Sequence, residues 1–169
     1  MTNFAFIDGQ NLHITVKEQL NWEIDYKKLY NYLKAKYKVE KAFYFIGYQK
    51  INTPLYHHLQ KAGFSVIFKE STVLPDGKSK GNCDAELVLF AMIHFNRYDK
   101  AILIAGDGDY ATLVKYLRRK NKLLKILVPN KQSYSFLLKK AAGKSWFEII
   151  SPINDLKTKL EFTKNRNTP

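Results

Sequence analysis

The stretch KAILIAGDGDYATLVKYLRRK, residues 100–120, decides the fold. A short apolar run ends at Gly106, carboxylates follow at Asp107 and Asp109, and a basic amphipathic segment comes next. Apolar runs of this length are typical of buried strands, whereas apolar residues spaced by three and four are typical of helices. The stretch therefore predicts a strand over residues 100–106, a tight turn carrying two acids, and a helix over residues 109–120.

The same alternation of strand and helix extends along the whole chain. Asp25 is the expected N-cap of one helix, and Gly63 the expected end of another. Alternating elements predict an α/β fold, in which helices cover both faces of a mainly parallel sheet. Residues 71–82 are predicted to be a polar loop, and residues 83–95 a well-buried helix. The other predicted strands are 3–8, 40–48, 64–70, 123–129 and 145–151, and the other helices are 24–37, 53–63 and 133–143.

Length and composition favour one folded domain. The chain has 169 residues, of which 46% are hydrophobic and 14% aromatic, enough for a sizeable core and too apolar for a disordered protein. We expect a single domain over residues 1–160 and a polar tail over residues 161–169.

The chain carries none of the usual signals for export or membrane insertion. Its apolar runs are too short to span a bilayer, and its start lacks the pattern of a signal peptide. A single cysteine, Cys83, excludes an internal disulfide. We therefore expect a cytoplasmic protein with no membrane partner, and the sequence leaves open whether it forms a homodimer.

The net charge is strongly positive. Twenty-eight Lys and Arg residues against fifteen Asp and Glu residues give a formal charge of +13. Such a charge attracts polyanions, nucleic acids among them. The alternative is a lysine-rich surface that serves only solubility.

The few acids fall where the predicted fold would bring them together. Asp8 ends the first strand, Asp84 and Glu86 open the helix after the long loop, and Asp107 and Asp109 follow a later strand. In open parallel sheets, ligands bind beyond the carboxyl ends of the strands. Carboxylates gathered there would hold either protons or a cation, and oxygen ligands of this kind suit Mg²⁺ or Mn²⁺.

Each acidic position also has a purely structural interpretation. Asp8 before Gly9 is typical of a turn at a strand end. Asn11 and Asp109 could be helix caps, and Asp84 would be favoured by the dipole of the helix it opens. Other chemistries fit less well, because the chain has no P-loop motif, no GxGxxG and no nucleophile elbow.

Three segments resemble the NYN domain in its LabA-like branch, part of the PIN-like nuclease superfamily. They are FAFIDGQNL, KGNCDAELVLFAM and YDKAILIAGDGDYATLVKYLRRKNKLLKILVP, and the resemblance extends over residues 3–150. It implies a PIN-like, Rossmann-like three-layer α/β/α sandwich that cleaves RNA with Mg²⁺ or Mn²⁺. The motif-matched metal ligands and catalytic acids are Asp8, Asp84, Asp107 and Asp109, with Asn11 supporting the site and Glu86 as a further acid.

Two positions depart from the family pattern. Ala105 stands where Ser or Thr is common, and Ala142-Gly143 where a late acid is common. The first change removes a hydroxyl that could position substrate or an acid, and the second leaves no late acidic ligand. Neither removes the main carboxylates.

These observations lead us to expect a metal-dependent ribonuclease. Its RNA would be held by basic residues, and Tyr110 would either stack on a base or pack over the sheet edge. One alternative is a non-catalytic RNA-binding or regulatory module. A small-substrate phosphatase is another, although Gln10 replaces the second acid that it would need after Asp8. The basic residues are Lys78 and Lys80 in the loop and Lys115, Arg118, Arg119, Lys120 and Lys122 on the helix and just after it.

Overall fold

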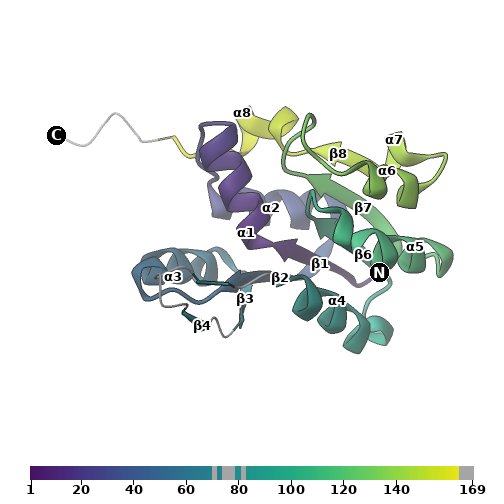
Figure 1. Cartoon of the computed structure of the whole chain (residues 1–169), viewed down its shortest axis with the longest axis horizontal. Coiled ribbons are helices and arrows are strands. Elements are labelled where there is room, and N and C mark those ends of the chain that lie inside the picture. Colours follow the sequence, from purple (N-terminus) through teal and green to yellow (C-terminus); the bar gives the residue numbers. More distant parts are fainter. Residues whose placement is uncertain (70–71, 74–78, 81–82, 164–169) are drawn as a thin grey trace.

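A computed structural model describes residues 1–69, 72–73, 79–80 and 83–163. Its centre is a six-stranded sheet in the order β3-β2-β1-β6-β7-β8, and every neighbouring pair of strands is parallel (Figure 1). The α/β fold expected from the sequence is confirmed. The strands of this sheet are β1 (Asn3–Asp8), β2 (Val39–Gly47), β3 (Ser65–Lys69), β6 (Lys100–Ile104), β7 (Leu123–Val128) and β8 (Ile150–Pro152).

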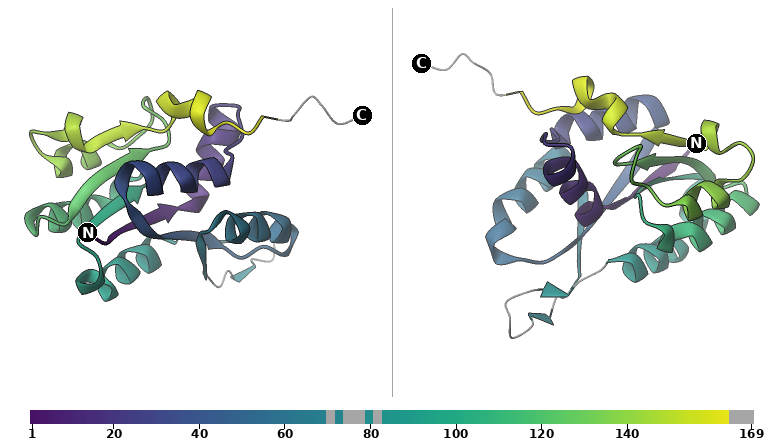
Figure 2. Two further views of the ribbon diagram at one scale, coloured as in Figure 1. Left: turned by 180° about the vertical axis from the view of Figure 1, so that it is seen from behind. Right: turned by 45° about the horizontal axis from the view of Figure 1, so that its top comes forward.

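Helices cover both faces of this sheet and make the three layers (Figure 2). One core contains side chains of α1 (Gly9–Ile14), α2 (Tyr26–Tyr37), α3 (Thr53–Ala62) and α8 (Lys157–Leu160). The other core contains side chains of α4 (Asp84–Ile93), α5 (Ala111–Arg119) and α6 (Phe136–Ala142). The remaining helical segments are η1 (Thr15–Gln19), η2 (Lys50–Asn52), η3 (Phe95–Arg97), η4 (Gly108–Tyr110), α7 (Trp146–Ile149) and η5 (Asn154–Leu156).

Strand β1 lies between β2 and β6, and all six of its residues are buried. Phe4 and Phe6 pack into one core, whereas Ala5 and Ile7 pack into the other. Burial on both faces explains why this strand has no alternation of polar and apolar residues. No helix in the described part of the chain has both the length and the apolar character needed to cross a bilayer.

Several predicted elements were wrong. Residues 145–151 are not one strand, because Trp146–Ile149 form α7 and only Ile150–Pro152 join the sheet. The helix over residues 83–95 is not well buried, since Leu89 is 62% and Ile93 65% exposed. The described part of the 71–82 loop contains a short antiparallel pair, β4 (Thr72–Val73) and β5 (Ser79–Lys80).

Helix α1 was not predicted at all. It begins directly after β1, with Asp8 as its N-cap, and continues into the π-helical turn η1. Gly9 packs against the ring of Tyr44, which is completely buried. A side chain at this position would displace the start of α1 from the sheet.

We therefore expect Gly9→Ala to lower the free energy of unfolding by about 3 kcal/mol, the upper range for overpacking. An added Cβ would lie 2.0 Å from Tyr44 Cε1 and 2.7 Å from the carbonyl oxygen of Phe45. Gly106→Ala is the matched control, because its Cβ would meet nothing closer than Asn11 Oδ1 at 3.4 Å. Urea denaturation of both variants measures the difference, and equal losses would contradict this account.

Candidate metal centre

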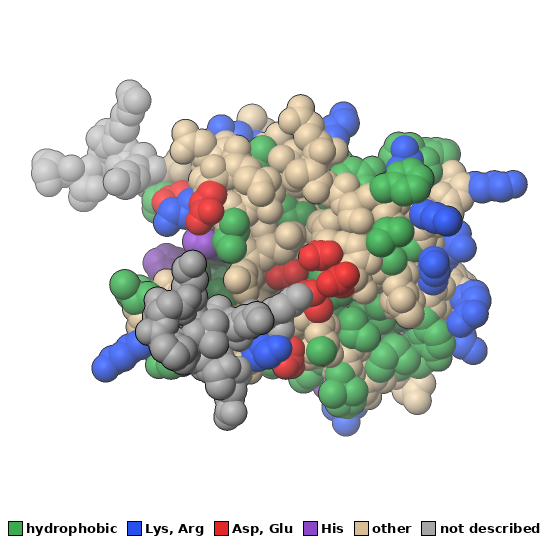
Figure 3. Space-filling model, in the orientation of Figure 1, with side chains coloured by type: hydrophobic (Ala, Val, Ile, Leu, Met, Phe, Trp, Pro, Cys, Tyr) green, Lys and Arg blue, Asp and Glu red, His purple; other side chains and the backbone are tan. Residues whose placement is uncertain are grey.

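The predicted acids lie at the carboxyl edge of the sheet. Asp8 is the last residue of β1, and Asp107 follows its neighbour β6 by a short turn. Asp84 is the first residue of α4, and Asp109 lies in η4. Figure 3 shows acidic side chains gathered near the middle of this face. Parallel pairing of β1 and β6 thus brings together residues about a hundred positions apart in the sequence.

Three of these acids have the geometry of a cation site. Asp84, Asp107 and Asp109 each offer one carboxylate oxygen, and the three oxygens lie within 4.8 Å of one another. Asp84 is half-buried, while Asp107 and Asp109 are exposed. Like charges this close repel, and a divalent cation would relieve the repulsion. A set of carboxylate oxygens fits Mg²⁺ or Mn²⁺ better than softer metals.

Asp8 lies behind this group and is not part of it. Its side chain is only 7% exposed. Asp8 Oδ1 accepts a hydrogen bond from the backbone N–H of Asn11 at 2.9 Å, and Oδ2 lies 3.0 Å from the Tyr110 hydroxyl. Burial raises the pKa of Asp8 to about 6, and the nearby charges of Asp84 and Asp107 act in the same direction.

Tyr110 joins Asp8 to the three-oxygen group. Its hydroxyl lies 2.5 Å from Asp84 Oδ1 as well as 3.0 Å from Asp8 Oδ2. A hydroxyl carries one hydrogen, so both contacts are hydrogen bonds only if one carboxyl is itself protonated. Burial and the adjacent Asp8 raise the pKa of Tyr110 far above its usual range. The ring is completely buried, so no base can stack on it in this structure.

Asn11 connects α1 to the turn that carries Asp107. Its Oδ1 accepts a hydrogen bond from the backbone N–H of Gly106 at 2.9 Å. Asp107 in turn accepts one from the backbone N–H of Asp109 at 3.1 Å. A cavity of about 380 Å³ opens beside these residues, and its wall includes Asn11, Thr15, Gln19, Asp107, Asp109, Asn130, Ser133 and Ser135.

Most of the chain matches a known protein family. The family model of the NYN domain matches residues 4–146, which is most of the chain. The chain belongs to the NYN domain family. That family is part of the PIN-like nuclease superfamily, so the superfamily expected from the sequence is confirmed.

Two relatives extend this comparison. The NYN chain is 25% identical over 125 residues to the "Low amplitude and bright protein LabA" of Synechococcus elongatus, with 68% of this chain and 67% of LabA covered. It is also similar to the crystal structure of VPA0982, a protein of unknown function from Vibrio parahaemolyticus. That match has a TM-score of 0.75 at 25% identity and covers 95% of this chain and 96% of the other. This NYN domain is of the LabA-like branch.

Glu86, the further acid expected in this NYN domain, does not join the three-oxygen group. It forms an ion pair with Lys69 at 3.3 Å. The structure therefore assigns Glu86 a contact between α4 and β3 rather than a place beside the metal centre.

The basic residues expected to hold RNA differ in their surroundings. Lys115, Arg118, Arg119 and Lys120 are exposed along α5 and just after it, and Arg118 also donates to the carbonyl of Ala142. Figure 3 shows Lys and Arg side chains along the side of the molecule where α5 lies. Lys78 and the side chain of Lys80 lie outside the described residues.

Lys122 has a structural role in the NYN fold. Its ammonium group donates to the carbonyl oxygens of Phe95, at 2.6 Å, and Tyr98, and lies over both rings. These contacts fix the segment between α4 and β6. An ammonium group has three N–H donors, and these two carbonyls occupy two of them, so one is left for a phosphate.

We expect Lys122→Met to lower the free energy of unfolding by about 2 kcal/mol, because two carbonyls lose a charged donor. Arg119→Met, on the exposed face of α5, should change it by less than about 0.5 kcal/mol. Thermal or urea unfolding of both variants tests this. If Lys122→Met unfolds like the wild type and only weakens RNA binding, the structural role is wrong.

Proposed function

We propose that this NYN domain is a ribonuclease that depends on Mg²⁺ or Mn²⁺. One observation carries the proposal: oxygens of Asp84, Asp107 and Asp109 lie within 4.8 Å of one another at the open edge of the sheet. Membership of a nuclease superfamily supports the same reaction class. The positive charge of +13 supports a polyanionic substrate.

The three exposed or half-buried carboxylates would hold the ion. A bound divalent ion supplies charge stabilisation to a phosphodiester in its transition state and lowers the pKa of coordinated water. The remaining residues position the ligands. The Tyr110 hydroxyl lies between the carboxyl groups of Asp8 and Asp84, and Asn11 holds the turn that carries Asp107.

The cavity of about 380 Å³ beside the acids would hold a segment of the sugar-phosphate backbone of RNA. Side chains of Thr15, Ser133 and Ser135 in its wall offer hydroxyl groups to phosphate and ribose oxygens. Exposed Lys115, Arg118 and Arg119 on α5, the helix that starts beside Asp109, supply charge for the neighbouring phosphates.

The test is cleavage of end-labelled single-stranded RNA by the purified chain. We expect cleavage with Mn²⁺ or Mg²⁺ and none in EDTA. Asp84→Asn should abolish cleavage, whereas Asp155→Asn, an exposed acid in η5, should not affect it. Absence of metal-dependent cleavage would refute the proposal.

The same assay separates the two alternatives. Salt-sensitive RNA binding that is indifferent to metal and to Asp84→Asn would indicate a non-catalytic RNA-binding module. Hydrolysis of a small phosphate ester without cleavage of RNA would indicate a phosphatase.

A further inference from the structure

A second cavity lies on the other side of the helical segment that walls the metal centre. Helix α1 and the turn η1 separate the two spaces. π-Helical turns such as η1 occur frequently at functional sites. Asn11, Thr15 and Gln19 line the cavity beside the acids, and His13, Val16 and Lys17 line the second cavity.

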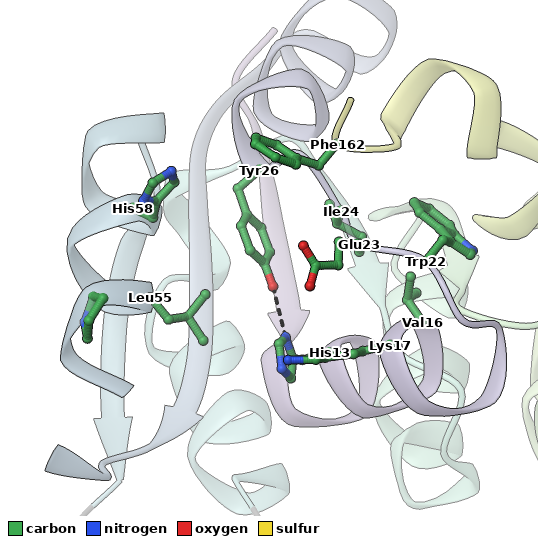
Figure 4. A pocket seen from close by; sticks show the side chains of 11 residues that line it. His13, Val16, Lys17, Trp22, Glu23, Ile24, Tyr26, Leu55, His58 and Phe162 are labelled. Carbon is green, nitrogen blue, oxygen red and sulfur yellow. Dashed lines mark hydrogen bonds between the residues drawn. The ribbon is translucent and has the colours of Figure 1, made fainter. Parts of the chain in front are cut away.

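The second cavity has the size and lining of a small-molecule site. Its volume is about 490 Å³, within the usual range for ligand pockets. Figure 4 shows aromatic and aliphatic side chains around it, from α2, α3, the segment before α2 and the C-terminal residues. Tyr26, Leu55 and Phe162 offer flat or apolar surfaces to a planar ring.

Among the described residues, one carboxylate lines this cavity, that of the exposed Glu23 (Figure 4). Within the part of the chain that the structure describes, no hydrogen bond or ion pair engages its side chain. An accepting group beside apolar walls favours a ligand that presents N–H donors. The chain has few acids, and this one is separate from the metal centre.

His13 adds a neutral polar group to the same wall. Its Nδ1 lies 3.2 Å from the Tyr26 hydroxyl. Burial lowers the pKa of His13, and nearby Lys17 acts in the same direction, whereas the charges of Glu18 and Glu23 act against it. Lys17 itself is exposed at the rim and offers donors to acceptor atoms of a ligand.

An adjoining hollow extends the cavity towards two lysines. It has a volume of about 300 Å³ and shares Tyr26, His58 and Phe162 with the second cavity. Lys27 and Lys61, both exposed, also line it, as does Asp25, whose carboxylate accepts a hydrogen bond from the backbone N–H of Lys28 as the N-cap of α2. Ammonium groups next to a ring-sized space match a phosphate attached to a planar base.

We propose that this second cavity binds a guanine base, with the Watson–Crick edge on Glu23 and the phosphate towards Lys61. Guanine presents two adjacent N–H donors, N1–H and N2–H₂, which match the two oxygens of a carboxylate. Adenine and cytosine each place an acceptor nitrogen next to the amino group, and uracil places carbonyls on both sides of its N–H. Unstacked bases are commonly recognised through this edge together with aromatic contacts.

The base has two sources, a free guanine nucleotide or a guanine in single-stranded RNA. The RNA source rests on the proposed function, because the strand would extend round α1 to the acids. The free-nucleotide source does not depend on it. In both cases the ligand would contact the helix that also carries Asn11.

Fluorescence of Trp22, which lines the cavity, provides the test. The chain has two tryptophans, so Trp146→Phe leaves Trp22 as the reporter. GMP, AMP, CMP and UMP would be titrated in EDTA, followed by uridine-rich RNA carrying one guanine or one adenine. We expect GMP, the guanine RNA, or both to bind about tenfold more tightly than the adenine counterpart.

Glu23→Gln should remove the preference for guanine over adenine. The control is Glu18→Gln, which should preserve it, because Glu18 is exposed on η1 and does not line the cavity. Selectivity for GMP identifies a free nucleotide as a sufficient ligand, and selectivity in RNA alone identifies the strand. Equal binding of guanine and adenine ligands, or a guanine preference that survives Glu23→Gln, would overturn the proposal. The binding titrations are made in EDTA and do not involve RNA cleavage. A negative result in the nuclease assay would therefore leave the measured guanine preference unchanged.

Discussion

Asp107→Asn should reduce metal-dependent RNA cleavage by at least about 100-fold, a loss of roughly 3 kcal/mol of transition-state stabilisation. The substitution removes one of the three carboxylates that lie within 4.8 Å of one another. Asn keeps the shape of the side chain and can still accept the hydrogen bond from the Asp109 N–H, so the turn should persist. The expected loss of cleavage therefore measures the effect of the missing charge and not a change in the conformation of the turn.

Two measurements separate metal binding from damage to the fold. Titration with Mn²⁺, followed by its electron paramagnetic resonance signal, should show weaker binding in Asp107→Asn. Urea unfolding in EDTA should show no loss of stability, because removal of one like charge relieves repulsion. Unchanged Mn²⁺ affinity together with unchanged cleavage would exclude Asp107 as a ligand.

Asp8→Asn should stabilise the metal-free protein at pH 7.5 and have little effect at pH 4. Burial raises the pKa of Asp8 from 3.8 to about 6, so the folded chain binds this proton more tightly than the unfolded chain. The associated stability is complete below pH 3.8 and is lost as the pH rises through 6. A shift of this size corresponds to at most about 3 kcal/mol. Asn cannot ionise, and it can still cap α1.

The measurement is the free energy of unfolding of both proteins in EDTA at several pH values. The difference between Asp8→Asn and wild type should grow by about 2–3 kcal/mol from pH 4 to pH 7.5. Taking the difference cancels the titration of all other groups. Asp155→Asn, an exposed control, should give a flat profile, and a flat profile for Asp8→Asn would contradict the burial argument.

Much of the fold follows from the sequence alone because its signals are local. Apolar runs such as AILIAG identify buried strands, and the alternation with helices predicts the parallel sheet. The position of Asp107 and Asp109 follows from that topology, since parallel strands end at one edge, whereas Asp84 reaches the same group as the first residue of α4. Helix α1 was missed because Asp8-Gly9 is also typical of a turn, and only packing against Tyr44 distinguishes the two.

The roles of Tyr110 and Lys122 could not have been predicted. Both depend on groups distant in the sequence: the carboxylates of Asp8 and Asp84 for the first, and the carbonyls of Phe95 and Tyr98 for the second. A tyrosine beside acids and a lysine after a basic helix are compatible with surface positions as well. The prediction for the segment SWFEIIS, residues 145–151, was wrong for a different reason. Its aromatic and β-branched residues favour a strand, but only its last residues join the sheet.

The position of β1 also has a consequence for synthesis of the protein. This strand is made first, yet it pairs with β6 through contacts such as Asn3 with Lys100. Translation proceeds from the N-terminus, so one edge of β1 stays open until the second half of the chain has left the ribosome. A nascent chain that ends before residue 107 lacks two of the three clustered carboxylates. The proposed metal centre can therefore form only after residue 109 has been synthesised.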